Sequence, residues 1–254
     1  MNKCRVVSDR LRDLARQLLP RSVLRRRNPL STPVPGRVTF GDLRRTRPID
    51  PYFGWRRGQP IDRYYIERFL ASHGSDVRGR VLEVGDATYT QRFGEGRVTR
   101  SDVLHVDADA PEATIVADLA DAAHIPADKF DCIILTQTLH LIFDVRAAVA
   151  TLHRILAPGG VVLATVPGIS QVDRGEWSNS WYWSFTGPAA RRMFETQFAA
   201  DDVAIEQHGS VLSAVALLEG LASHELTEDE LSVDDDAYPV FVGIRAVKGG
   251  LTAT

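Results

Sequence analysis

The segment from Gly79 to Gly168 constrains the fold more than any other part of the chain, because short apolar runs recur along it at regular spacing. Strands that are buried on both faces have continuous apolar runs, which is typical of a parallel sheet covered by helices. The runs predict strands at residues 80–84, 97–102, 114–118, 131–136 and 161–166. We therefore expect an α/β fold with a doubly wound, mostly parallel sheet.

The remaining elements follow from apolar periodicity and from helix start and stop signals. An entry helix is expected within residues 51–76, starting near Pro60 and Asp62, and Thr227 is expected to open a short acidic helix. The other predicted helices and strands are, in order, helices at 145–156, 188–198 and 211–222 and strands at 203–208 and 240–247.

Length and composition favour a cytoplasmic protein. The 254 residues can form one large domain or two small ones. No apolar run reaches the roughly 18–20 residues needed to span a bilayer, and no apolar segment near Met1 is typical of a secretory signal. Cys4 lies in a basic stretch and Cys132 in an apolar strand, so a disulfide framework is not expected.

Charge is distributed unevenly along the chain. Residues 1–50 carry 13 Lys and Arg against 4 Asp and Glu, a net charge of +9, whereas the rest carries 17 against 29, a net charge of −12. We expect a basic N-terminal arm at 1–50, which includes a helix at residues 9–19, then a domain at 51–248 and a tail at 249–254. Two interpretations of the arm stay open: a partly disordered extension, and docking on a membrane surface or an acidic protein.

Acidic residues close three of the first four predicted strands. Because ligands of parallel sheets bind outside the carboxyl ends of the strands, Glu83, Asp102 and Asp118 are expected to face a ligand that offers hydroxyls and amines. The alternative is that each acid only caps the following helix. Asp131 begins its strand and is expected to be structural.

The first predicted turn argues against nucleotide phosphates. A dinucleotide fold needs G-x-G-x-x-G after the first strand, but here only Gly85 is kept, and Asp86 would repel a phosphate. The chain also has no G-x-x-x-x-G-K-[ST] loop, so NAD, FAD and nucleoside triphosphates are all disfavoured.

Five motifs in order resemble the class I S-adenosylmethionine-dependent methyltransferases, in particular the small-molecule and glycan subgroup often called type 11. They are VLEVG at 81–85, Asp102, VADL at 116–119, KFDCII at 129–134 and LAPGG at 156–160. The resemblance covers about residues 60–200. It implies a seven-stranded Rossmann-like sheet with an antiparallel last strand, and S-adenosyl-L-methionine as cofactor.

The resemblance also implies roles for residues along the predicted edge. The cofactor-binding candidates are Glu83, Gly85, Asp86, Ala87, Asp102, Val103, Asp118, Leu119 and Thr136, with Asp102 on the ribose, Asp118 on the adenine amine, and Val103 and Leu119 flanking the adenine ring. The chain departs from the family at Ala87 and Tyr89, which replace glycines of the first turn. Loss of cofactor binding, leaving an inactive binding or scaffold protein, is therefore the alternative function.

Methylation of an alcohol requires a group that removes a proton, and the candidates follow the fourth predicted strand. His140 is the first choice, with Gln137 and Asp144 beside it, and the alternative for His140 is a histidine packed under the sheet edge. No C-x-x-C or H-E-x-x-H pattern indicates a metal site.

The stretch 169–186 is rich in aromatic residues and is expected to form a lid over the acceptor, with Trp183 and Phe185 buried and Trp177 and Trp181 exposed. Aromatic faces can stack on a sugar or another ring. WSFT at 183–186, followed by a helix, also occurs in the family that the chain resembles, and this resemblance implies a small molecule, a sugar or a glycoconjugate hydroxyl as the acceptor. A nucleic-acid substrate is disfavoured because the domain is acidic.

Overall fold

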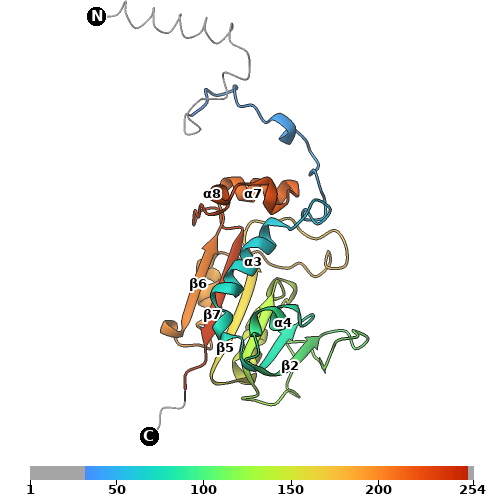
Figure 1. Ribbon diagram of the computed structural model, residues 1–254, viewed down its shortest axis with the longest axis vertical. Helices are drawn as coiled ribbons and strands as arrows, with labels where there is room; N and C mark the ends of the chain where they lie inside the picture. The colour runs from blue at the N-terminus through green and yellow to red at the C-terminus, as the bar shows by residue number, and fades with distance from the viewer. Residues whose placement is uncertain (1–31, 251–254) are drawn as a thin grey trace, which may run out of the picture. The chain divides into compact units, whose positions relative to one another are not determined.

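The computed structural model describes residues 32–250 (Figure 1). The chain divides into two units, Met1–Arg45 and Thr46–Thr254. In the first unit, the described residues contain the short 3-10 helix η1, Gly41–Leu43. The helix expected at 9–19 and the residue Cys4 lie outside the described part of the chain.

The second unit contains a seven-stranded sheet in the order β3-β2-β1-β4-β5-β7-β6. All neighbouring strands from β3 to β5 are parallel, and β7 is antiparallel to both β5 and β6. The expected doubly wound, mostly parallel sheet with an antiparallel last strand is confirmed. The strands are β1 Gly79–Val84, β2 Val98–His105, β3 Ile115–Val116, β4 Phe130–Thr136, β5 Leu156–Pro167, β6 Val203–His208 and β7 Phe241–Val247.

Helices cover both faces of this sheet, as alternating strands and helices require. One apolar core joins the sheet to α3, α4 and α7, and the second joins it to α5 and α6. None of the described helices is both long and apolar enough to cross a membrane. The helices are α3 Ile61–Ser72, α4 Thr88–Gly94, α5 Val145–Ile155, α6 Gly187–Phe194, α7 Val211–Glu219 and α8 Glu228–Leu231, with 3-10 turns η2 Gly74–Asp76, η3 Leu139–Leu141, η4 Ala200–Asp202 and η5 Ser223–Glu225.

Several boundaries follow from local chemistry, and one strand boundary was wrong in a way that matters. The β6 strand has the predicted ends, and the Thr227 side chain caps α8 by accepting from Glu230 N. The β2 strand, however, was expected to end at Asp102 and continues to His105. Asp102 therefore lies inside the sheet and not at its edge.

The strand order reverses between β1 and β4, which lie side by side with one set of neighbours on either side. Ligands of open α/β sheets bind at such a switch point, outside the carboxyl ends of the strands. We call this edge the ligand edge. The β6 strand also ends there, because His208 and Pro167 both pair with Phe241.

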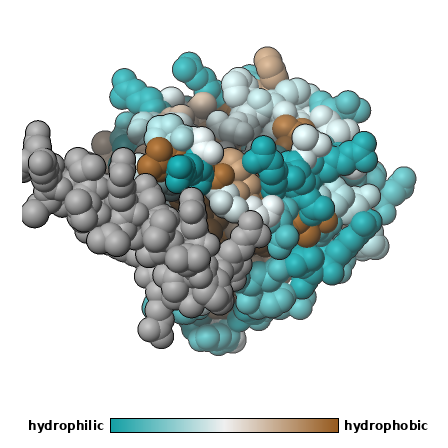
Figure 2. Space-filling view, turned by 90° about the horizontal axis from the view of Figure 1, so that it is seen from above, coloured by the Kyte–Doolittle hydropathy of each residue, from teal (hydrophilic) through white to brown (hydrophobic). Residues whose placement is uncertain are grey.

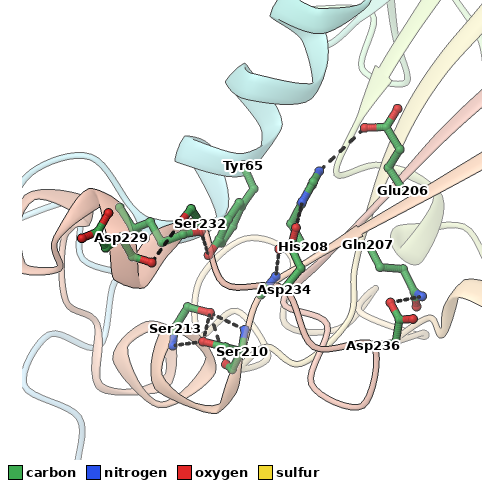
Figure 3. A network of polar contacts seen from close by, with 12 residues as sticks. Tyr65, Glu206, Gln207, His208, Ser210, Ser213, Asp229, Ser232, Asp234 and Asp236 are labelled. Atoms are coloured by element: carbon green, nitrogen blue, oxygen red, sulfur yellow. Dashed lines mark hydrogen bonds and ion pairs between the residues drawn. The ribbon is translucent and has the colours of Figure 1, made fainter.

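Residues 209–240 connect β6 to β7 at the ligand edge, and this insertion contains α7 and α8 (Figure 1). It is fastened by the side chains shown in Figure 3: the His208 ring contacts the Asp234 carboxylate at 2.9 Å and stacks on the Tyr65 ring. The Tyr65 hydroxyl in turn donates to the Leu231 carbonyl at 3.0 Å. The insertion therefore has a fixed place at the ligand edge.

Candidate functional site

Three exposed carboxylates stand in equivalent positions along the ligand edge. Asp86, Asp107 and Asp118 each follow the last residue of β1, β2 and β3 by two positions. In each, Oδ1 accepts from the backbone N–H two residues further on, at 2.8, 2.9 and 2.8 Å. Among residues 32–250, Oδ2 of these three has no hydrogen-bond donor, so each presents a free oxygen at the edge.

Glu83 differs from these three, because its side chain is only 2 % exposed. Its two carboxylate oxygens accept from Tyr89 N at 3.0 Å and Thr90 N at 2.7 Å, at the start of α4. Burial raises the pKa of Glu83, and the hydrogen bonds from Thr90 and Tyr89 oppose that effect. Glu83 therefore holds the first turn in shape, and its expected direct contact with the cofactor is corrected to an indirect role.

The expectation that Asp102 binds the ribose needs a larger correction. Its carboxylate is buried within β2 and accepts from Arg80 Nε at 2.8 Å and Nη2 at 3.3 Å. An ion pair across neighbouring strands satisfies both oxygens away from the edge. Asp107 stands where Asp102 was expected, and the repeated acids of HVDAD at 105–109 were the signal that could have identified it.

Val103 and Leu119 were expected to flank an adenine ring, but both side chains are buried in the protein. Val103 precedes the end of β2 by two residues, and Leu119 packs in the same apolar core as Leu104. Both side chains fill the core, and neither is offered at the ligand edge.

The first turn can accommodate a ligand in spite of its lost glycines. Gly85 has φ of +100°, and a Cβ built there would meet no atom within 4 Å, so its backbone borders open space. Ala87 is the N-cap of α4. Tyr89 points away from the turn: its ring stacks on Phe93, and its hydroxyl accepts from Arg63 Nη1 at 3.1 Å. Arg63 itself is a cation near the turn that the sequence interpretation missed.

The chain turns sharply after β4. Gln137 has a backbone φ of +47°, a conformation that residues other than glycine rarely adopt. Its N–H donates to the Thr165 carbonyl at 2.9 Å. Such strained backbone clusters at functional sites. Thr136 ends β4 beside this turn, and Asp144 caps α5 by accepting from Ala147 N at 3.0 Å. The helix cap accounts for the position of Asp144.

His140 lies in η3, directly after this turn, with only 2 % of its surface exposed. Its Nδ1 has no hydrogen-bond partner among the described residues, and its ring lies 4.2 Å from the Trp181 ring, centre to centre. Burial lowers the pKa of His140 to about 4. The imidazole is therefore neutral at pH 7 and able to accept a proton.

The aromatic stretch lies at the ligand edge because its backbone is fixed to η3. The N–H groups of Tyr182 and Trp183 donate to the His140 carbonyl at 2.9 and 3.3 Å. Phe185 is buried and Trp177 exposed, as predicted, and Trp181 is half-buried. The prediction for Trp183 was wrong.

Trp183 is exposed because it stacks on Phe143, another exposed ring, and donates from Nε1 to the Ile142 carbonyl at 3.0 Å. These two rings line one side of a groove of about 500 Å³ between the starts of α5 and α6. Across the part of the chain that the structure covers, no group of three or more His, Cys, Asp and Glu side chains is placed to hold a metal ion.

Comparison with known proteins decides the family. The model of the methyltransferase domain family matches residues 54–227, more than half of the chain. The chain belongs to this family. It is a methyltransferase of class I, an enzyme whose cofactor is S-adenosylmethionine. No curated protein matches the sequence.

A solved structure of another methyltransferase has the same fold, and a second resembles the chain less closely. The methyltransferase superposes on an S-adenosylmethionine-dependent methyltransferase from Archaeoglobus fulgidus with a TM-score of 0.50 and 11% identity, covering 73% of this chain and 94% of that one. An S-adenosylmethionine-dependent methyltransferase from Mesorhizobium loti has a TM-score of 0.47 and 16% identity, covering 74% and 98%. At these identities the likeness concerns the fold alone.

The residues of the ligand edge fit this cofactor. It offers a ribose diol, an adenine amine and a sulfonium, and it has no phosphate that the carboxylates after β1, β2 and β3 would repel. Open space beside Gly85, with Tyr89 turned away, leaves room at the first turn.

Proposed function

We propose that the methyltransferase methylates a hydroxyl oxygen of a small molecule, with a sugar or glycoconjugate as the leading class of acceptor. The observation that carries the proposal is the neutral, buried imidazole of His140 at the end of β4, with a ring nitrogen that has no partner among the described residues. An alcohol must lose its proton when it is methylated, and a positioned imidazole is the commonest group that accepts one.

The cofactor, when bound, supplies an electrophilic methyl group on a sulfonium. Asp107 would accept hydrogen bonds from the ribose hydroxyls, and Asp118 from the adenine amine, each through its free Oδ2. Gly85, Asp86 and Ala87 would border the methionine end, with Arg63 as the nearby cation. Thr136 and Gln137 would lie beside the reacting centre, because they form the strained end of β4.

Trp181 lies against His140 and limits access to it. We infer that residues 169–186 act as a lid, and that an acceptor reaches the imidazole when Trp181 moves aside. The aromatic rings of Trp177, Trp181, Tyr182 and Trp183 would then cover the apolar face of a sugar ring. His140 would take the hydroxyl proton at Nδ1, while Asp144 keeps α5 in place as its cap.

The test uses trideuteromethyl S-adenosylmethionine and a panel of free, phosphorylated and nucleotide-linked sugars, read by mass spectrometry and NMR. We expect a labelled methyl ether. A label on nitrogen or carbon, or no transfer to any hydroxyl while the cofactor binds, would overturn the proposal.

The variant His140→Gln tests the base. We expect kcat to fall about 100-fold or more, the scale of general base catalysis, while affinity for S-adenosylhomocysteine stays the same. His153→Gln is the matched control, since His153 is a half-buried histidine of α5 whose ring packs on Phe198. Because burial lowers the pKa of His140, kcat is also expected to stay level as the pH falls to the ordinary pKa of histidine, about 6.5, and to fall only below it. A fall centred above 6.5 would point to another base.

A further inference from the structure

The outer face of α7 is entirely aliphatic. Val211, Leu212, Val215 and Leu218 are each between 37 and 49 % exposed, whereas the other residues of this helix are buried or half-buried. Their spacing places all four on one side of the helix. Figure 2 looks onto the end of the body where α7 lies and shows hydrophobic residues between hydrophilic ones. A solvent-facing helix normally carries polar residues on this side. We therefore expect this stripe of four aliphatic side chains to contact a binding partner.

Two exposed aromatic residues lie next to the end of α7. Tyr52 and Trp55 are 47 and 58 % exposed, in the loop before α3. This loop packs closely on the chain after α7, because Gly54 approaches the Leu221 carbonyl too closely to leave room for a side chain. The Arg56 guanidinium lies 3.9 Å from the centre of the Tyr52 ring. Tryptophan and tyrosine beside aliphatic residues and a cation are typical of a surface at the lipid–water interface.

The charge of the arm suits an anionic bilayer. Residues 1–50 carry a net charge of +9, with consecutive arginines at 25–27. The arm joins the body close to α7, because Asp50 N donates to the Glu219 carbonyl at 3.0 Å. Basic segments gain roughly 1 kcal/mol per residue near an anionic membrane. The acidic α8 belongs to the same insertion, so attraction to anionic lipid must come from the arm and not from α7.

The size of the stripe argues against a second copy of this chain as its partner. The stripe has four aliphatic side chains, each less than half exposed, whereas each partner contributes about 20–30 residues to a stable interface. A bilayer sets no such minimum, because insertion needs only a few apolar side chains combined with charge attraction.

We propose that α7, Tyr52 and Trp55 form a docking surface that inserts into the interface of a bilayer containing anionic lipid, and that the basic arm strengthens this binding. The insertion that carries α7 lies at the ligand edge. Docking would therefore turn the ligand edge toward the bilayer, and an acceptor carried by a lipid would reach the site, a consequence that rests on the proposed function.

The experiment is co-sedimentation of the full chain with vesicles of phosphatidylcholine, alone and with phosphatidylglycerol. We expect binding to the anionic vesicles. The double variant Leu212→Gln, Leu218→Gln should lower the partition coefficient at least about tenfold, since both side chains lose their apolar contact with lipid. Val116→Gln is the matched control, an exposed aliphatic residue of β3, which is the strand farthest from β6 in the sheet order, and should bind as the wild type does.

The triple variant Arg25→Gln, Arg26→Gln, Arg27→Gln separates the contribution of the basic arm from that of the aliphatic face of α7. Its binding to anionic vesicles should fall about tenfold or more, and its binding to neutral vesicles should stay unchanged.

Circular dichroism checks that each variant is folded. No binding of the wild type to either vesicle would overturn the proposal, as would equal binding of the leucine variant. A wild-type dimer that the leucine variant dissolves would assign the surface to a second copy. None of these outcomes depends on methyl transfer, so docking can fail while the proposed function holds.

Discussion

The interior of the sheet and its ligand edge both carry carboxylates, but the two regions use them differently. Inside, Glu83 and Asp102 are each only 2 % exposed, and both of their oxygens are hydrogen-bonded within the protein. At the edge, Asp86, Asp107 and Asp118 are exposed and have one oxygen each without a donor among residues 32–250. An acid near a strand end therefore stabilises the fold when both of its oxygens are hydrogen-bonded within the protein, and it is available to a ligand when one oxygen is free.

The largest effect on stability is expected at Glu83. The variant Glu83→Ala leaves the buried N–H groups of Tyr89 and Thr90 without an acceptor. Each such group costs about 1–3 kcal/mol, so we expect a loss of about 3 kcal/mol in the free energy of unfolding. Urea denaturation of the variant and the wild type measures this loss of stability.

Glu83→Gln is the control for that substitution, because it keeps one side-chain oxygen as an acceptor. It should lose about half as much stability and remains measurable if the alanine variant does not fold. If Glu83→Ala unfolds at the wild-type urea concentration, the interior acids do not hold the fold as we argue.

Substitutions of Asp102 and Asp107 should have opposite effects on stability and on cofactor binding. Asp107→Ala should weaken S-adenosylhomocysteine binding by about 1.5–3 kcal/mol, the scale of a hydrogen bond to a charged group, with stability unchanged. Asp102→Ala should instead cost about 1–2 kcal/mol of stability, because Arg80 loses its buried partner but stays partly hydrated, and affinity should change little.

Titration calorimetry and urea denaturation of both variants decide between these assignments. The opposite pattern, with weak cofactor binding in Asp102→Ala alone, would return the ribose to Asp102. Equal losses of affinity in both variants would show that the two regions are not separate in function.

The same pair shows how far the sequence can predict this protein. Apolar runs predicted the sheet, and β6 has the predicted ends, because its run is bounded by polar residues. At β2 the residues before Asp102 are mostly polar, and the acid looks like a strand end, although Val103 and Leu104 follow it. The pairing of these two residues with β1 shows that the strand continues, and the contact with Arg80 explains how an acid is tolerated inside it.

The prediction of which rings are buried in the aromatic stretch failed for a related reason. Phe185 and Trp183 look alike in the sequence, but Trp183 stacks on Phe143, which belongs to a different loop. Tyr89 is the converse case: it replaces a family glycine, yet Arg63 and Phe93 hold it away from the turn. Contacts with residues far away in the chain, Phe143 and Arg63, therefore decide the positions of Trp183 and Tyr89.

The smallest expected effect lies at β6, the last strand in the sheet order, where carboxylates contact histidines (Figure 3). Glu206 contacts His73 at 2.7 Å and lies 3.7 Å from His208, which also contacts Asp234. These contacts lower the pKa of Glu206 to about 2, mainly through His208 and His73. Glu206 and Asp234 raise the pKa of His208 against the opposing effect of burial.

The signs of these shifts define a pH window. The contribution of Glu206 is complete above its unfolded pKa of about 4.3 and is lost as the pH falls toward 2. The contribution of His208 is complete below about 6.5 and is lost as the pH rises through its raised pKa. For such partly exposed pairs we expect His208→Gln to cost at most about 1 kcal/mol near pH 5.5, and less at pH 9. Thermal unfolding of both proteins across this range measures the difference. If the stability lost in His208→Gln grew with pH, His208 would hold the insertion in place as a neutral ring and not through charged contacts with Glu206 and Asp234.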